Sequence, residues 1–301
     1  MKKNRVRAGA AAIIGILMAA GSAYGAGTTS GEFLKLGIGE RAVGMGGAFS
    51  SIVDNVTAVY WNPAGLAQLT TQEISAMHMN YLVEIKSDYL GYAHPLGLGS
   101  LGLQLSVLYL KDERWVDNSG PAGTFWDYEG VLGVGYGAWV NSRLSLGATL
   151  KGFYSKLDSD EVKCFGADIG GLYRTGISGL NIGAVVQNIS AGMVLPLNLK
   201  VGVSYRMFGS NLIVASDLNV PYGGRSSLNM GGEYWYVPVE KWGLKVATRL
   251  GFDTFGLEGF DVMSAICAGL GFQWKGYAMD YAWVPYGQLG NTHRISFSAK
   301  F

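Results

Sequence analysis

The sequence predicts an all-β protein: a transmembrane antiparallel β-barrel of about 14 strands with an N-terminal hatch in its lumen. Three observations favour this fold class. Apolar and polar residues alternate along most of the chain after residue 70, strand-sized segments are joined by connections that are short and long in turn, and aromatic residues gather near strand ends. Hydrophobic residues make up 49% of the chain and charged residues only 15%. With no long apolar run in the mature chain, these apolar groups must be distributed periodically.

The chain begins with a basic stretch and a short apolar run. MKKNRVR precedes AGAAAIIGILMAA, and small residues follow in GSAYGAG. This order is typical of a secretory signal peptide. The alternative is a membrane anchor, but the run is shorter than the ~20 residues that a spanning helix needs. Residues 1–25 are therefore predicted to be a signal peptide, and the bacterial outer membrane is the predicted destination.

Residues 26–70 are predicted to form the hatch. They keep neither a helix nor a strand period for long, and they are rich in glycine, which allows close backbone packing. Fourteen strands enclose a lumen wider than wall side chains fill, so an apolar segment fits inside it. Two aromatic residues of this segment are expected to wedge against the inner wall. The predicted hatch residues are Arg41, Gly44, Gly46, Gly47, Tyr60, Trp61, Asn62, Pro63 and Gly65.

The stretch AVYWNPAGLAQL marks the junction between hatch and barrel. Asp54 and Asn55 are predicted to cap a short helix that runs through Trp61. Pro63 is predicted to end that helix, because the residue before a proline avoids helical geometry. Gly65 is expected to permit the turn that leads to the first strand.

Residues 71–301 are predicted to form the barrel. In NLKVGVSYRM, for example, every second residue is apolar, and polar residues or glycine lie between. A soluble β-sandwich alternates in the same way, but these strands are about ten residues long, enough to cross a bilayer when tilted. The predicted strands lie near residues 73–84, 87–95, 99–110, 124–139, 142–156, 162–175, 179–190, 197–208, 211–220, 226–236, 242–252, 261–275, 276–284 and 292–301.

The last predicted strand, HRISFSAKF, ends in an aromatic residue. A closing strand with a terminal aromatic looks like the signal that the barrel assembly machinery reads. Phe301 is therefore the predicted assembly signal.

Several kinds of site are disfavoured by composition and spacing. The net charge of +1 offers no basic patch for nucleic acid, and the three histidines lack metal-ligand spacing. No cofactor motif is present. A surface-lipid esterase is the main enzymatic alternative, but it requires a nucleophile beside an oriented base, and no motif supports one. We expect a non-enzymatic protein without cofactor or metal, whose Cys164 and Cys267 are free buried thiols on non-adjacent strands.

Two predicted outer loops carry large apolar residues. DTFGLEGFD contains Phe255, Leu257 and Phe260, and KDERWVDNSGPAG contains Trp115. Exposed apolar groups of this kind mark a partner surface. They could equally fold over the mouth of the barrel, and the sequence favours neither interpretation.

Residues 33–69 and 279–301 resemble the PorV/PorQ family, whose fold is similar to the FadL-type fatty-acid channels. The motifs RAVGMGGAF, WNPAGLA and LGNTHRIS, in this order, carry the resemblance. It implies an integral outer-membrane protein with a luminal hatch. It also implies an adapter role in type IX secretion, in which such proteins bind secreted cargo and deliver it to surface-modification machinery.

The alternative is a FadL-like transporter for long-chain fatty acids or other hydrophobic compounds. The expected partners are outer-membrane lipid, the barrel assembly machinery, and either secreted cargo proteins or a hydrophobic small molecule. Pro95 and Pro196 fall in predicted connections. Because no proline then interrupts a strand to open the wall, this placement slightly favours the adapter.

Overall fold

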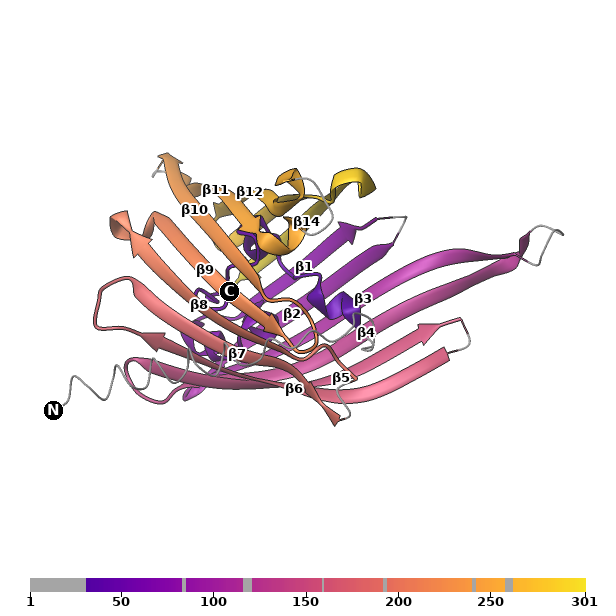
Figure 1. Ribbon diagram of the computed structural model, residues 1–301. Helices are drawn as coiled ribbons and strands as arrows, with labels where there is room; N and C mark the ends of the chain where they lie inside the picture. The colour runs from indigo at the N-terminus through magenta and orange to yellow at the C-terminus, as the bar shows by residue number, and fades with distance from the viewer. Residues whose placement is uncertain are drawn as a thin grey trace.

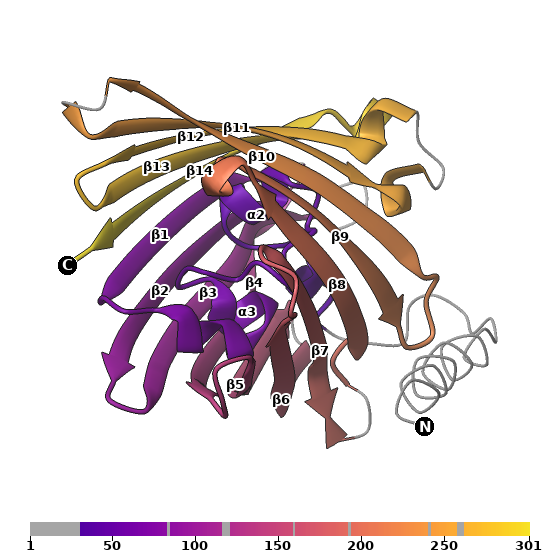
Figure 2. The same cartoon turned by 90° about the vertical axis from the view of Figure 1, so that its left-hand side faces the viewer.

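Fourteen antiparallel strands close into one barrel, and the first strand pairs with the last (Figures 1 and 2). Every strand pairs with its neighbours in the sequence, as in an up-and-down barrel. This computed structural model describes residues 31–82, 85–115, 121–158, 160–191, 194–239, 242–257 and 262–301. The predicted signal peptide lies outside the described residues. The predicted antiparallel barrel of about 14 strands is confirmed.

The strands agree with the predicted ranges at most boundaries. They are β1 (Glu73–Asn80), β2 (Lys86–Leu96), β3 (Gly99–Trp115), β4 (Pro121–Trp139), β5 (Leu144–Leu157), β6 (Asp160–Arg174), β7 (Leu180–Ser190), β8 (Asn198–Met207), β9 (Leu212–Pro221), β10 (Ser227–Val239), β11 (Leu244–Asp253), β12 (Ile266–Trp274), β13 (Tyr277–Pro285) and β14 (Asn291–Lys300). In the described residues, four short 3₁₀ helices lie in three of the connections: η5 (Phe208–Ser210), η7 (Thr254–Leu257), η8 (Val262–Ala265) and η9 (Gly287–Leu289).

The strands place apolar side chains outward and polar side chains inward. On β5, Leu150 is 69% exposed, whereas the neighbouring Thr149 and Lys151 are buried. On β14, Phe297 is exposed and Arg294 is buried. A soluble protein would bury the apolar face instead, so this inverted pattern identifies the outer surface as lipid-facing.

The two ends of the barrel differ in their connections. Even-numbered strands lead into odd-numbered strands through turns such as Lys275–Gly276, where φ is 46° and 89°. Two successive positive φ values define the tight hairpin turn that matches strand twist. We call this the short-turn end and the opposite end the loop end. The predicted sorting by length holds in part: the β11–β12 connection spans residues 254–265, but the β5–β6 connection only residues 158–159.

One predicted outer loop is mostly strand. β3 continues to Trp115 and β4 begins at Pro121, and these two residues pair with each other. The placement of Trp115 in a loop was therefore wrong. Where a hairpin extends beyond the bilayer, both of its faces contact water. The alternation of apolar and polar residues then ends, although the backbone hydrogen bonds between the two strands continue.

Two further expectations are corrected. The strand predicted from residue 261 begins at Ile266, because η8 precedes it. Pro95 lies inside β2, opposite Ser100, rather than in a connection. The position of Pro95 therefore gives no support to the adapter role.

The N-terminal part of the described chain lies inside the ring of strands (Figure 2). We call residues 31–69 the inner segment. It contains η1 (Glu32–Lys35), α2 (Glu40–Gly44), α3 (Ala58–Trp61) and η2 (Pro63–Gln68). Its apolar side chains form the main hydrophobic core together with inward-facing wall residues such as Met77, Tyr89 and Ala93. No helix in the described parts of the chain is long and apolar enough to span a membrane.

The lipid-facing assignment predicts a position-dependent cost of charge. Leu150→Arg should destabilise the barrel in lipid vesicles by about 2–4 kcal/mol, since it places a cation near the middle of the bilayer. The matched control is Leu98→Arg, in the β2–β3 turn, where the leucine is 87% exposed; it should cost less than about 1 kcal/mol. Urea unfolding followed by tryptophan fluorescence measures both. Equal costs would contradict the assignment.

Candidate functional site

A buried chain of alternating charges joins the inner segment to the barrel wall. The Arg41 guanidinium donates from Nε and Nη2 to the two carboxylate oxygens of Glu233, at 2.7 and 2.8 Å. Its remaining nitrogen, Nη1, donates to Asp54. In order, the chain of charges is Arg206, Asp54, Arg41, Glu233, Arg249 and Asp280.

This charge network balances three cations against three anions. Buried charges are tolerated when each is paired and hydrogen-bonded. Burial alone would raise the pKa of Asp54, but the guanidinium groups of Arg41 and Arg206 outweigh burial and hold that pKa well below its usual value. Because β8, β10, β11 and β13 each supply one member, the network fixes α2 and the following turn to four strands at once.

A second set of contacts fixes the backbone of the inner segment. The Asp217 carboxylate on β9 accepts hydrogen bonds from the amides of Phe49 and Ser50, at 3.1 and 2.8 Å. Wall donors also satisfy carbonyls of the segment. These donors are Trp139, Ser145, Thr149, Gln187 and Ser204, which bind the carbonyls of Ala67, Ala64, Val59, Tyr60 and Ser51. Polar residues of the inward face therefore anchor the segment from β4 round to β9.

The Trp-Asn-Pro turn has the local geometry that the sequence predicts. α3 ends at Trp61, and Asn62 is extended with φ −166° before Pro63. The Asn62 side chain then accepts from the Ala64 amide and donates to the Ser50 carbonyl. Asn62 therefore closes one helix, caps the next and ties the turn to a distant part of the segment.

Two details of that turn differ from expectation. Neither Asp54 nor Asn55 caps α3, whose N-cap residue is Thr57. Asp54 binds arginine, and Asn55 accepts from the Thr57 amide and hydroxyl. Gly65 does not form a turn either, since it lies within η2. A Cβ on Gly65 would overlap the Val53 carbonyl. Glycine is required there by close packing rather than by an unusual φ.

The predicted glycines pack the segment against the wall and against itself. A Cβ on Gly44 would lie 3.1 Å from the Gly269 Cα of β12. Gly46 has φ 66°, and a Cβ there would meet the backbone of Phe252 on β11. Gly47, with φ 76°, lies against the Trp61 ring.

Tyr60 and Trp61 pack mainly within the inner segment, and less against the wall than expected. The Trp61 indole donates to the Ile38 carbonyl at 2.7 Å. The wall contributes Lys200, whose Nζ lies 4.5 Å from the Trp61 ring centroid. The Tyr60 hydroxyl donates to the Leu34 carbonyl at 2.6 Å and accepts from the Gly37 amide at 3.3 Å.

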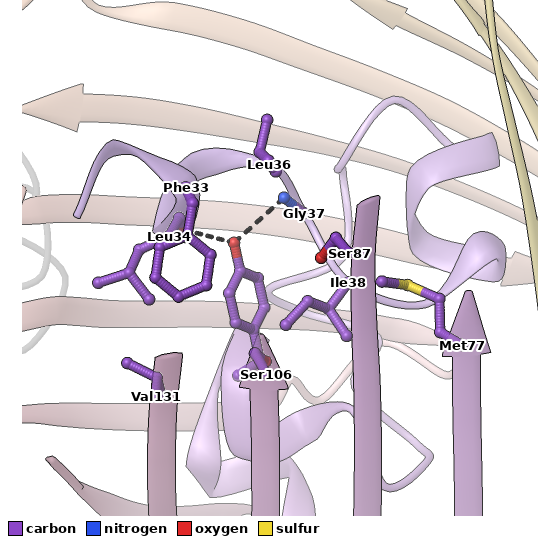
Figure 3. A pocket seen from close by; sticks show the side chains of 10 residues that line it. Phe33, Leu34, Leu36, Gly37, Ile38, Met77, Ser87, Ser106 and Val131 are labelled. Carbon is purple, nitrogen blue, oxygen red and sulfur yellow. Dashed lines mark hydrogen bonds between the residues drawn. The ribbon is translucent and has the colours of Figure 1, made fainter. Parts of the chain in front are cut away.

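A small apolar pocket lies between the start of the inner segment and strands β1 to β4 (Figure 3). Its volume is about 10 Å³, the space of roughly one water molecule. Tyr60 lines this pocket, and its hydroxyl bonds the backbone of Leu34 and Gly37 at the start of the same segment. The Arg294 guanidinium also holds this region, through the carbonyls of Leu36 and Gly37 at 2.8 and 3.3 Å. The pocket is lined by Phe33, Leu34, Leu36, Gly37, Ile38, Tyr60, Met77, Ser87, Ser106 and Val131.

Glu40, at the start of α2, is the least compensated acid of the inner segment. It is fully buried, and neither carboxyl oxygen accepts a hydrogen bond of normal geometry from the described residues. Burial raises the pKa of Glu40 to about 7, although Ser296 and Arg294 favour the ionised form. The group therefore titrates near neutrality.

The remaining predicted residues are dispersed. Phe255 lies in η7 and is 61% exposed. Leu257 ends η7, and Phe260 lies outside the described residues. Phe301 exchanges two backbone hydrogen bonds with Gln72 beside β1. Its role in assembly stays a prediction, as does the role of the loop residues.

The histidines and cysteines form no reactive centre in the described chain. His78 pairs with Asp88 on the outer face, and His293 pairs with Tyr281. No group of three potential metal ligands occurs among the described residues. Both cysteines are free, as predicted, but only Cys267 is buried, and Cys164 is partly exposed.

Sequence reasoning missed the acids that fix the inner segment. Glu233 and Asp217 lie on inward-facing positions of β10 and β9, so alternation could have identified both as luminal. Nothing in the pattern pairs Glu233 with Arg41, 192 residues away.

Removal of the Arg41 side chain should release the inner segment. Arg41→Ala leaves buried Glu233 and partly buried Asp54 each short of one partner, and breaking a buried pair typically costs about 3–5 kcal/mol. The matched control is Lys35→Ala, which removes a half-exposed pair with Glu32 worth less than about 1 kcal/mol. Limited proteolysis should cleave residues 31–69 much faster in Arg41→Ala than in Lys35→Ala or wild type. Equal protection would refute the anchoring role.

The Glu40 carboxyl predicts a pH dependence. Its pKa rises from 4.5 to about 7 on burial, so its neutral form stabilises the docked segment fully below pH 4.5. This stabilisation is lost as the pH rises to 7, a change of about 3 kcal/mol. Glu40→Gln should be more stable than wild type at pH 8 and equal to it at pH 4. Thermal unfolding in detergent at both pH values measures this difference, and a pH-independent difference would contradict it.

The barrel is similar in fold to solved transporter and channel barrels. The toluene transporter TbuX of Ralstonia pickettii has a TM-score of 0.56 and 13% identity, over 88% of this chain and 98% of that one. CymD, a monoaromatic hydrocarbon channel, has a TM-score of 0.60 and 12% identity, over 88% and 98%. The toluene transporter TodX of Pseudomonas putida has a TM-score of 0.57 and 11% identity, over 88% and 96%. At these identities the likeness shows the fold alone.

Sequence comparison gives a family. No curated protein matches the chain, and the PorV/PorQ resemblance receives no support from these comparisons. One family model, described as "Uncharacterised protein family (UPF0164)", matches residues 10–210, which is two thirds of the 301 residues. The chain therefore belongs to the UPF0164 family.

Proposed function

We propose that this protein is a FadL-like channel for hydrophobic compounds in the bacterial outer membrane, with the inner segment as its hatch. The observation that carries the proposal is the apolar pocket between the inner segment and strands β1 to β4. The solved barrels with the same fold include two toluene transporters and a monoaromatic hydrocarbon channel. This function was the alternative in the sequence-based prediction, and it now has the stronger support.

The contacts of the inner segment are unevenly distributed, which suggests how such a channel would open. Residues 39–69 carry the charge network, the Asp217 contacts and the wall donors. Residues 33–38 receive hydrogen bonds from the Tyr60 hydroxyl and the Trp61 indole, within the segment, and from Arg294 on the wall. Regions with few anchoring contacts open at low free energy. Movement of residues 33–38 would therefore enlarge the pocket while the rest of the hatch stays in place.

Apolar side chains of wall and segment would line the enlarged space. Phe33 stacks near Phe153, with ring centroids 6.2 Å apart, and Leu195 joins the same buried cluster. Ligand sites are typically mainly apolar with a few polar groups. This composition suits a hydrophobic compound and offers little to a hydrophilic solute.

An adapter for secreted proteins is the second candidate, and one observation favours it. Phe255, Val262 and Met263 are each more than half exposed around η7 and η8, in the β11–β12 connection. An exposed apolar cluster of this kind suits a protein partner. Type IX cargo would be such a partner.

Gene deletion distinguishes the two candidates. Loss of a channel should lower the uptake of radiolabelled toluene or a long-chain fatty acid several-fold and leave the surface proteome unchanged. Uptake of a small sugar serves as the control for general damage to the membrane. Loss of surface proteins with normal uptake would reject the channel in favour of the adapter.

A further inference from the structure

Several buried polar groups on the inward face of β2 and β3 have no hydrogen-bond partner among the described residues. They are the Tyr89 hydroxyl, both amide atoms of Gln104 and the Ser106 hydroxyl. The three residues are 3%, 2% and 3% exposed. Buried polar groups are normally paired, so each such group requires an explanation.

These groups are neighbours, and they begin at the pocket. Ser106 lines the pocket together with Ser87 (Figure 3). Ser106 lies opposite Tyr89 in the β2–β3 register, and Gln104 lies opposite Gly91, one step closer to the short-turn end. We call Ser106, Tyr89 and Gln104 the polar track. It leads from the pocket along the wall toward the short-turn end.

The polar track does not anchor the inner segment. Elsewhere on the inward face, Ser145, Thr149 and Gln187 each donate to a carbonyl of that segment. The groups of the polar track face the same segment without making such a bond. Their hydrogen-bonding capacity is thus available to a molecule that enters between segment and wall.

We propose that the polar track binds a neutral hydrogen-bonding group on the transported compound, so that the preferred substrates are uncharged amphipathic molecules such as aromatic alcohols or phenols. This inference rests on the proposed function. The apolar pocket residues hold the body of the compound, and the hydroxyl of Ser106 contacts its polar group first. No charged side chain lines the pocket, so a neutral group fits better than a carboxylate. Displacement of residues 33–38 provides the room.

A pair of ligands with the same shape tests this inference. Benzyl alcohol and ethylbenzene differ only in one hydroxyl group against one methyl group. With full-length protein in detergent, calorimetric titration should show that Ser106→Ala weakens benzyl alcohol binding about fivefold, as expected for one lost hydrogen bond. Ethylbenzene binding should stay within about twofold.

Two more variants separate recognition from folding. Ser155→Ala is the matched control, because this buried serine already donates to Glu129; it should change neither affinity. Tyr89→Phe removes only a hydroxyl and should slow benzyl alcohol entry into proteoliposomes without slowing ethylbenzene. Equal effects on both ligands, or none in either variant, would overturn the inference and leave the channel standing. Failure of wild type to bind or pass either compound would overturn the channel as well.

Discussion

The bidentate ion pair between Arg41 and Glu233 is the interaction on which the interior of this barrel depends. Lipid contact requires an apolar outer face, so the strands must place their polar residues inside. Those polar residues are then buried by the inner segment, and each charge needs a partner. Arg41, on α2, is the partner of Glu233, and it pairs with Asp54 as well. The same contacts that neutralise the wall therefore position the segment.

The hydrogen bonds and ion pairs between the barrel wall and the inner segment are concentrated on one side of the barrel. Among the described residues, most ion pairs and donated hydrogen bonds between wall and segment come from β4 to β11, and Ser100 on β3 and Arg294 on β14 add to them. Tyr89 on β2 and Gln104 and Ser106 on β3 present groups that are unpartnered in the described chain beside an apolar pocket. We propose that this asymmetry lets one part of the hatch move without the rest. Glu40 adds a sensitivity to pH near neutrality, because its ionised form is poorly compensated in the buried α2.

Much of the fold was predictable because lipid imposes a rule on every strand. Alternation predicted β5, β8, β11 and β14 to within about two residues. Where the lipid constraint ends, at Trp115 on the β3–β4 hairpin, prediction failed. In the candidate site, the extended backbone of Asn62 could be predicted, because the residue before a proline avoids helical geometry. The pairing of Arg41 with Glu233 and the unpartnered state of Ser106 depend on three-dimensional packing that no local pattern contains.

We propose that the inner segment fills the lumen, so that the barrel is closed to water and ions. Conductance of the purified wild-type protein in planar lipid bilayers tests this claim most directly. The wild-type protein should carry no steady ion current, with at most brief openings. A stable, open-pore conductance in every inserted molecule would contradict it, since a fourteen-stranded barrel without an obstruction encloses an aqueous channel.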